Sequence, residues 1–272
     1  MALYVNETGP VTAPTIVFLH GGGVGGWMWQ RQTAALTDYH CLVPDMPEQG
    51  RSIAIKPLTI PDTAAQIADL IRLRAHGGVA HLVGLSLGAQ VGVQLLALAP
   101  KLIDHALISS ALVHPLPGGW MLRPGLLKWL FRLSVSPFKN SQWWARINMR
   151  YAAGIPEEYF AQYFEEYRAM TDQSFADVMI VNQQFRIPNG LDNVKSPVLM
   201  TVGQKEYKVM HDSARDLAAA IPGSSAYVVD HDPKLSMAQQ HNWSMNAPEM
   251  FTETVRAWIT NQPLPAGLQP LV

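Results

Sequence analysis

A serine between two glycines is the residue whose setting most clearly indicates chemistry. The segment Gly84-Leu85-Ser86-Leu87-Gly88 follows an apolar run of strand type and opens a helical pattern. A G-x-S-x-G nucleophile elbow requires this context, because its serine occupies a sharp, strained turn in which a Cβ at either flanking position would crowd the backbone. The spacing therefore predicts that Ser86 is a nucleophile. The first N–H groups of a helix are free, so the N–H of Leu87 is a candidate donor to an oxyanion.

A run of glycines near the N-terminus fits two different chemistries. The stretch His20-Gly21-Gly22-Gly23-Val24-Gly25-Gly26 follows another apolar run, and uncovered N–H groups in such a loop can stabilise an oxyanion. The same stretch contains a G-x-G-x-x-G fingerprint, with Asp45 placed where a ribose-binding acid would stand, which predicts an NAD(P)-dependent oxidoreductase. We consider this alternative weaker. Trp27 directly follows the glycines and would hinder a pyrophosphate, and Ser86 would be left without a role.

A nucleophilic serine needs a histidine as its base, and the histidine needs a carboxylate that orients it. After an elbow of this type the acid and then the base follow the serine along the chain. Two histidines, His231 and His241, follow the last strand-like run, and the residues alone leave both open. His105 lies in or beside an earlier strand-like run, where we expect a structural histidine.

Short apolar runs alternate with helical patterns in the first and last parts of the chain. Runs that are apolar on both faces are typical of parallel strands covered by helices on both sides, so an α/β sheet is predicted. The expected strands cover residues 15–19, 41–43, 81–85, 106–110, 197–202 and 226–230, and the expected helices begin near residues 60, 86, 212 and 247. The intervening part lacks strand-like runs. We therefore expect a core of residues 1–111 and 192–272 that is interrupted by a helical cap of residues 112–191.

Aromatic residues are concentrated in the expected cap. A helix begins there near Pro156, and Tyr159, Tyr163 and Tyr167 then recur every four residues. This spacing places the three rings on one face of the helix. The face either packs against neighbouring elements or forms part of a lid over an apolar pocket.

The composition argues against several functional classes. Among 272 residues, 20 Lys and Arg stand against 21 Asp and Glu, so there is no basic footprint for nucleic acid or an anionic membrane surface. The uncharged stretch from Ala75 to Pro100 contains glycines and glutamines, which favours a strand, a turn and a buried helix over a membrane span. A single cysteine, Cys41, and the lack of a signal-peptide pattern lead us to expect a cytoplasmic protein.

Four segments, in this order, resemble the α/β-hydrolase superfamily. His20 to Gly23 is similar to its oxyanion loop, and Gly84 to Gly88 to its nucleophile elbow. Residues 45–52, DMPEQGRS, resemble a D-x-P-G-x-G-x-S turn in which Glu48 replaces the usual glycine. The segment from His241 to Ala247-Pro248-Glu249 resembles the closing H-x-x-x-x-x-A-P-E motif. The resemblance implies the α/β-hydrolase fold, a mostly parallel sheet flanked by helices, and selects His241 over His231 as the base.

The resemblance also implies which residues assist Ser86 and His241. In the superfamily the acid commonly stands three residues after a glycine that ends a strand, which selects Glu206; Asp212 and Asp192 are the alternatives. Glutamate here departs from the commoner aspartate. The two oxyanion donors would be the N–H groups of Gly22 and Leu87.

Within the superfamily, the loop from His20 to Trp29 resembles that of the methylesterase and hydroxynitrile lyase group. Its lyases carry Thr at the position of Gly21 and Lys at the position of Asn242, so both departures favour ester hydrolysis.

We therefore expect a serine hydrolase that cleaves carboxylic esters of small to medium apolar substrates. No spacing typical of a metal site or of a P-loop occurs, so we expect neither a metal nor a cofactor. A small-molecule ester is the expected partner, and the chain is expected to be a monomer or a homodimer. The same residues would serve a lactonase, a thioesterase, an amidase or a carbon–carbon bond hydrolase. A non-catalytic ligand receptor of the same fold is a further alternative.

Overall fold

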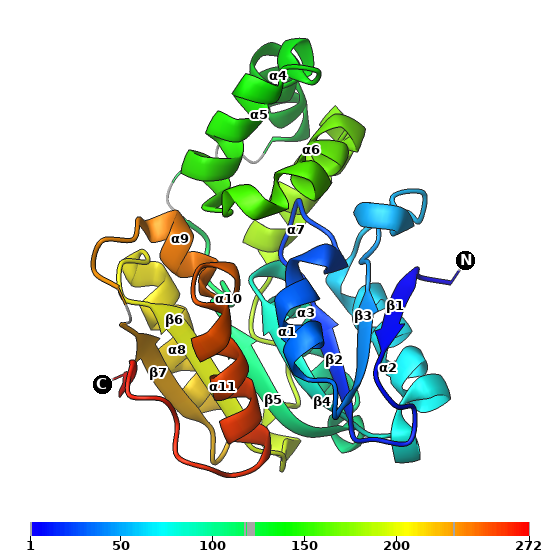
Figure 1. The fold of residues 1–272 in the computed structure, drawn as a ribbon, viewed down its shortest axis with the longest axis vertical. Coiled ribbons are helices and arrows are strands. Elements are labelled where there is room, and N and C mark those ends of the chain that lie inside the picture. The colour runs from blue at the N-terminus through cyan, green and yellow to red at the C-terminus, as the bar shows by residue number, and fades with distance from the viewer. Residues whose placement is uncertain (1, 117, 119–122, 231, 272) are drawn as a thin grey trace.

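The computed structural model describes residues 2–116, 118, 123–230 and 232–271. In this part of the chain, eight strands form one sheet in the order β1-β3-β2-β4-β5-β6-β7-β8 (Figure 1). The edge strands β1 and β8 pair antiparallel, whereas the other pairs are parallel. The strands are β1 Val5–Thr8, β2 Thr15–Leu19, β3 His40–Pro44, β4 Ala80–Leu85, β5 Ile103–Ser109, β6 Val198–Gly203, β7 Ser225–Val229 and β8 Leu268–Pro270. The prediction of an α/β sheet is confirmed.

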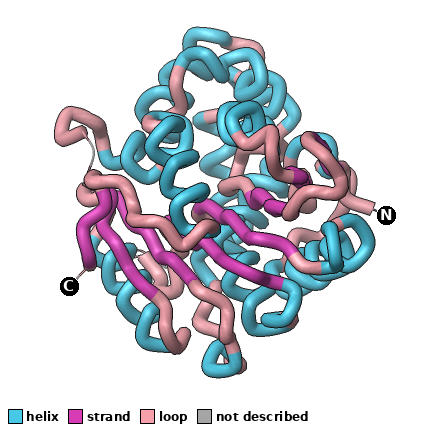
Figure 2. Tube along the Cα trace, turned by 60° about the horizontal axis from the view of Figure 1, so that its bottom comes forward, coloured by secondary structure: helices cyan, strands magenta, loops and turns pink. Residues whose placement is uncertain are grey.

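Helices cover both faces of this sheet, as the layers in Figure 2 show. Alternate residues of β2 enter two separate cores: Val17 and Leu19 enter one, and Ile16 and Phe18 the other. The first core packs against α2 Ile60–Arg74, α3 Leu87–Leu98 and α8 Lys208–Ala220. The second packs against Trp29 and Leu36, which flank α1 Gln30–Ala35, and against α10 Trp243–Asn246 and α11 Pro248–Ile259. Two-sided burial explains why the central strands are mostly apolar.

A group of fully buried aromatic rings holds the second core together. The ring of Trp29 lies 5.3 Å from that of Phe18 and 5.4 Å from that of Phe251, and Trp243 lies 4.6 Å from Phe251. Tilted contacts of this kind contribute about 0.5–1.5 kcal/mol each beyond the burial of area. They fix the segment that follows His241 against the sheet.

The start of one helix and the presence of two strands differ from expectation. The helix expected near Asp212 begins four residues earlier, at Lys208, an exposed residue that gives no apolar signal for the start of a helix. Strands β1 and β8 were not expected. Both are short edge strands with exposed residues, so they carry no apolar run to reveal them.

The helical segment between β5 and β6 lies over the ends of the strands (Figure 1). It contains α4 Pro124–Ser134, α5 Gln142–Ile147, a π-helical turn Asn148–Ala153, α6 Phe160–Ala169 and α7 Asp172–Gln184. Tyr159, Tyr163 and Tyr167 are all buried, so this aromatic face packs against neighbouring elements, which is one of the two expected arrangements. The boundaries of a cap domain remain a prediction.

The uncharged stretch after Ala75 forms β4 and α3, as predicted. No helix in the described ranges combines the length and the apolar character needed to cross a membrane.

Candidate active site

Ser86 occupies a strained turn between β4 and α3. Its backbone angles are φ 55° and ψ −116°, a conformation that side-chain-bearing residues rarely adopt. A Cβ at Gly84 would lie 2.7 Å from the carbonyl oxygen of Gly88, and a Cβ at Gly88 would collide with the carbonyl of Leu19. The two glycines are therefore required by close backbone approach. The turn has the geometry expected of a nucleophile elbow.

Glu206 is a buried carboxylate with three hydrogen-bond donors. Its Oε1 accepts bonds from the hydroxyl of Ser110 at 2.6 Å and from the N–H of Gly203 at 2.8 Å. Its Oε2 faces Nδ1 of His241 at 2.8 Å. Only 3% of its side chain is exposed, against 28% of that of His241. The structure thus brings together the acid and the base expected from the sequence.

The charges of this pair shift both pKa values. Burial alone would raise the pKa of Glu206, but the charge of His241 and the three hydrogen bonds lower it below its ordinary value. Burial alone would lower the pKa of His241, but the charge of Glu206 and its hydrogen bond raise it above the ordinary value. The carboxylate is therefore ionised, and it orients an imidazole whose Nδ1 carries the proton.

The segment that carries His241 is anchored on two sides. His241 ends the short helix α9 Met237–His241, and the neighbouring Gln240 accepts the N–H of Lys205 at 2.7 Å, which joins this helix to the loop of Glu206. On the other side, the Asn242 amide donates to the carbonyl of Ala153. Asn246 donates to the carbonyl of Gly154 at 2.8 Å, so the base is tied to the helical segment above the sheet.

Ser86 lies at the same edge of the sheet as this pair. Its N–H donates to the carbonyl of Ser109 at 2.9 Å, and the next residue, Ser110, holds Glu206. No hydrogen bond joins the hydroxyl of Ser86 to His241 among the described residues. A nucleophile and its base often approach closely only when substrate is bound, so the lack of this bond does not argue against the two residues acting together.

Two backbone N–H groups beside Ser86 are free to bind an anion. The N–H groups of Gly21 and Gly23 are occupied by Sδ of Met28 at 3.4 Å and by Oε1 of Gln49 at 2.7 Å. Between them, the N–H of Gly22 has no acceptor in the described part of the chain, and neither has that of Leu87. A Cβ at Gly22 would lie 3.8 Å from Cβ of Leu87, so the two groups are neighbours. Two N–H groups placed in this way could donate to the same oxygen atom.

A cavity of about 380 Å³ begins at Gly22 and extends beneath α6 and α7. Its walls are mainly apolar or aromatic side chains, with polar side chains from five other residues. The apolar walls include Val135, Tyr163, Tyr167, Met170, Phe175 and Val178, and the polar side chains are those of Glu48, Gln49, Asn148, Glu166 and Ser174. Neither Ser86 nor His241 is among its lining residues, whereas Gly22, which neighbours Leu87, is one of them.

Two carboxyl groups of the cavity have raised pKa values. Glu166 accepts the indole N–H of Trp27 at 2.7 Å, yet burial raises its pKa to about 8. Glu48 is 3% exposed and accepts the N–H of Leu58 at 3.1 Å, and burial raises its pKa as well. The φ of Glu48 is +64°, a conformation that favours glycine. This explains why glycine is the usual residue at the position of Glu48 in the turn that residues 45–52 resemble.

The alternative site residues have other roles or places. Asp45 accepts the N–H of Gly26 at 2.7 Å and that of Arg51 at 2.8 Å, so this carboxylate braces the glycine loop and is not free for a ribose. Asp212 pairs with Lys208 on α8, and Asp192 is exposed in a turn before β6. His231 lies outside the described residues. Sequence reasoning missed Ser110, because a serine after a strand has no distinguishing signal.

Comparisons with known proteins agree with this architecture. The sequence model of the alpha/beta hydrolase family matches residues 16–257. An AB hydrolase superfamily protein of Gibberella zeae is 25% identical over 271 residues, which cover 94% of this chain and 83% of the relative. The carboxylesterase YbfK of Bacillus subtilis is 24% identical over 274 residues, covering 94% and 83% of the two chains.

Among solved structures, the enol-lactonase from Burkholderia xenovorans LB400 superimposes with a TM-score of 0.73 at 20% identity, covering 95% of this chain and 96% of that one. The expected fold is thereby confirmed.

Proposed function

The chain belongs to the alpha/beta hydrolase family, and from this premise we propose that it is a serine hydrolase that cleaves carboxylic esters through an acyl-enzyme on Ser86. The observation that supports this most strongly is the buried pair of Glu206 and His241, joined at 2.8 Å at the sheet edge where the strained elbow carries Ser86. A buried acid that orients a histidine beside a serine is the arrangement that nucleophilic catalysis needs.

In the first half of the reaction, His241 takes the proton of the Ser86 hydroxyl while Oγ attacks the ester carbonyl carbon. The electron pair of the carbonyl moves to its oxygen, and the N–H groups of Gly22 and Leu87 stabilise that charge. When the tetrahedral intermediate collapses, the alcohol leaves with the proton held by His241. Glu206 accepts the Nδ1–H bond throughout and stabilises the imidazolium.

In the second half, water replaces the alcohol. His241 takes a proton from the water, whose oxygen attacks the acyl carbon, and the same two N–H groups stabilise the second oxyanion. Collapse returns the proton to Oγ of Ser86 and releases the carboxylic acid. All proton transfers use residues of this chain.

The helical segment of residues 112–191 acts in this proposal as a cap over the substrate. Its helices α6 and α7 supply most of the apolar wall of the cavity that begins at Gly22. A wall of tyrosine, phenylalanine, methionine and valine favours a substrate with an apolar part. The volume of about 380 Å³ fits a small to medium acyl or alcohol group.

The first test is turnover of a chain-length series of p-nitrophenyl esters by the purified chain, with Ser86→Ala as the control. We expect a maximum at one acyl length and its loss in the variant. Lactone, thioester and amide substrates in the same assay separate ester hydrolysis from the reactions that the same residues would also serve. Equal turnover by Ser86→Ala would overturn the mechanism.

A fluorophosphonate probe then distinguishes an enzyme of narrow specificity from a receptor. Labelling of the wild-type chain but not of Ser86→Ala shows an activated nucleophile even when no ester in the series is cleaved. Absence of both turnover and labelling would contradict the proposed function.

A further inference from the structure

An irregularity in the sheet brings three possible metal ligands to one place, at the opposite ends of the strands from Ser86. Ala80 of β4 pairs with Ile103 of β5, but Leu82 already pairs with Ala106. One residue of β4, His81, therefore faces two residues of β5, Asp104 and His105. Such a bulge changes the direction of side chains that would otherwise alternate between the two faces of the sheet.

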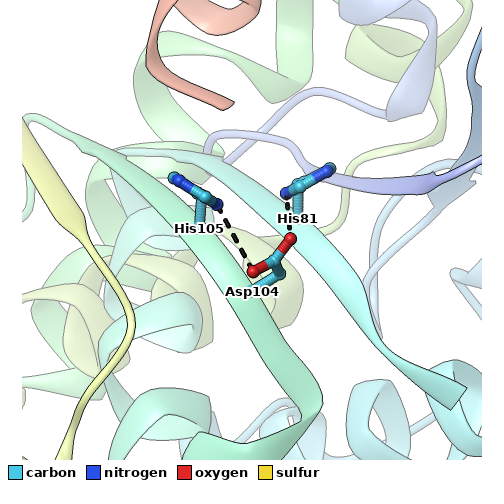
Figure 3. A group of neighbouring side chains, drawn as sticks. All are labelled: His81, Asp104 and His105. Atoms are coloured by element: carbon cyan, nitrogen blue, oxygen red, sulfur yellow. Dashed lines mark ion pairs between the residues drawn. The ribbon is translucent and has the colours of Figure 1, made fainter. Parts of the chain in front are cut away.

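The three side chains point toward one another, as Figure 3 shows. Nδ1 of His81 lies 3.6 Å from one oxygen of Asp104, and Nδ1 of His105 lies 3.5 Å from the other. The three donor atoms lie within 4.8 Å of one another. Sequence motifs gave no sign of this group, because its members come from two strands and follow no recurring metal-site spacing.

The two imidazole nitrogens lack partners that would account for their burial. Nδ1 of His81 and Nδ1 of His105 are both buried without a hydrogen-bond partner in the described ranges. Their side chains are 9% and 10% exposed. Distances of 3.5–3.6 Å to Asp104 are at or beyond the limit of a hydrogen bond. A buried polar atom without a partner destabilises the folded chain, so a group that binds these two nitrogens would stabilise it.

The surroundings suit a cation that enters from solvent and binds the lone pairs of the two imidazole nitrogens. The carboxylate of Asp104 is 57% exposed, which provides a path to the two nitrogens. Nε2 of His105 faces Oδ1 of Asn261 across a similarly long contact of 3.5 Å, and the tautomer that carries its proton on Nε2 keeps the Nδ1 lone pair free. The ring of His105 also packs edge-on against Trp258.

We propose that His81, Asp104 and His105 form a binding site for a divalent transition-metal ion of the zinc class. Two imidazole nitrogens and one carboxylate oxygen are ligands that such ions accept, and water completes the coordination. Ligands 2.0–2.1 Å from one ion lie about 3.3 Å apart in a tetrahedron. The exposed Asp104 side chain supplies the small movement that closes the group around the ion.

The site has a structural role in this proposal. It joins β4 to β5, the two strands whose other ends carry Ser86 and Ser110. Because the ion binds the folded chain, its binding stabilises that state. It lies too far along the strands to contact the substrate, so the proposal stands or falls independently of the proposed ester hydrolysis.

The test is titration of the full-length chain, first treated with a chelator, with Zn²⁺ by calorimetry and with Cu²⁺ by electron paramagnetic resonance. We expect one ion per chain, hyperfine coupling to two nitrogens, and a Tm that rises with Zn²⁺. Asp104→Asn and His105→Gln should each weaken binding at least tenfold. His114→Gln is the matched control, because His114 also lies beside a carboxylate, that of Asp216, but on the surface.

The outcomes decide the proposal without reference to activity. Asp104 is exposed, so Asp104→Asn is expected to fold even if a histidine variant does not. Absence of saturable binding at micromolar Zn²⁺ would overturn the site. Affinity that is unchanged in Asp104→Asn, or that falls equally in His114→Gln, would also overturn it.

Discussion

The hydroxyl of Ser110 donates a 2.6 Å hydrogen bond to Oε1 of Glu206, the oxygen of that carboxylate that does not face His241. Ser110 directly follows β5 and has a strained backbone with φ +54°. Its side chain positions the carboxylate of Glu206, which follows the neighbouring strand β6. The bond fixes the rotation of the carboxylate and favours its ionised form.

Ser110→Ala should therefore act through Glu206. Loss of the bond raises the pKa of Glu206 and loosens its orientation, so we expect kcat to fall about tenfold with little change in KM. The acid side of the pH–kcat profile should shift as well, which a purely structural effect would not cause. Ser134→Ala, whose hydroxyl donates only to a carbonyl of its own helix, is the control.

Ser86→Ala should lower kcat by roughly 10³–10⁶ while the fold remains intact. The variant removes the nucleophile, but it leaves the backbone turn and both oxyanion donors in place. Circular dichroism and Tm measured beside the ester assay separate loss of chemistry from loss of structure. Loss of activity together with a large fall in Tm would not support a catalytic role.

Activity should fall as the pH drops through the pKa of His241. The neutral imidazole is the base, and Glu206 raises its pKa above the value of about 6.5 that is usual for histidine. The acid limb of kcat/KM should therefore lie above pH 6.5. In Glu206→Gln the carboxylate charge is lost, so the limb should move to lower pH while the plateau falls. If the acid limb of kcat/KM does not move in this variant, another carboxylate orients His241.

Gly22→Ala should disturb the oxyanion hole through the cap. The new Cβ would lie 2.8 Å from Cγ1 of Val178 on α7, so either the loop or the helix must shift. Displacement of the Gly22 N–H by part of an ångström should lower kcat/KM roughly ten- to a hundredfold. The double variant Gly22→Ala/Val178→Ala removes the clash and should recover much of the activity, and Val178→Ala alone is the control. If the double variant does not recover activity, the loss comes from a changed direction of the Gly22 N–H and not from the clash with Val178.

Glu166→Gln should stabilise the fold increasingly as the pH rises. Burial raises the pKa of Glu166 to about 8, whereas the unfolded carboxyl titrates near 4.3. Between these two values the unfolded chain releases a proton that the folded chain keeps, so wild-type stability falls with rising pH. Glutamine does not titrate and still accepts the indole N–H of Trp27.

The Tm of the variant should therefore exceed that of the wild type only slightly at pH 4, and the excess should grow up to pH 8. Each kcal/mol of relative stabilisation corresponds to roughly 2–4 °C in Tm. The exposed Glu165→Gln is the control for loss of one negative charge. A constant difference across this range would contradict the prediction.

The sequence predicted those features that are set locally. The elbow around Ser86 was predictable because only glycine tolerates the backbone contacts on its two sides, and the central strands because both of their faces are buried. The edge strands and the start of α8 were not, since exposed residues carry no apolar pattern. Ser110, Glu166 and the group around Asp104 depend on which strands and helices become neighbours, and the local sequence does not encode that.

The anchoring of Asn242 and Asn246 to the carbonyls of Ala153 and Gly154 constrains how such a protein can diverge. Helices α4 and α5 can drift in sequence, or gain and lose turns, with little consequence for the residue next to the base. The chain at 153–154 cannot, because it must keep two carbonyl oxygens in place, and because a side chain at Gly154 would strike the backbone of Ala238. Adaptation to new substrates should therefore accumulate at the distal end of the helical segment and spare this junction.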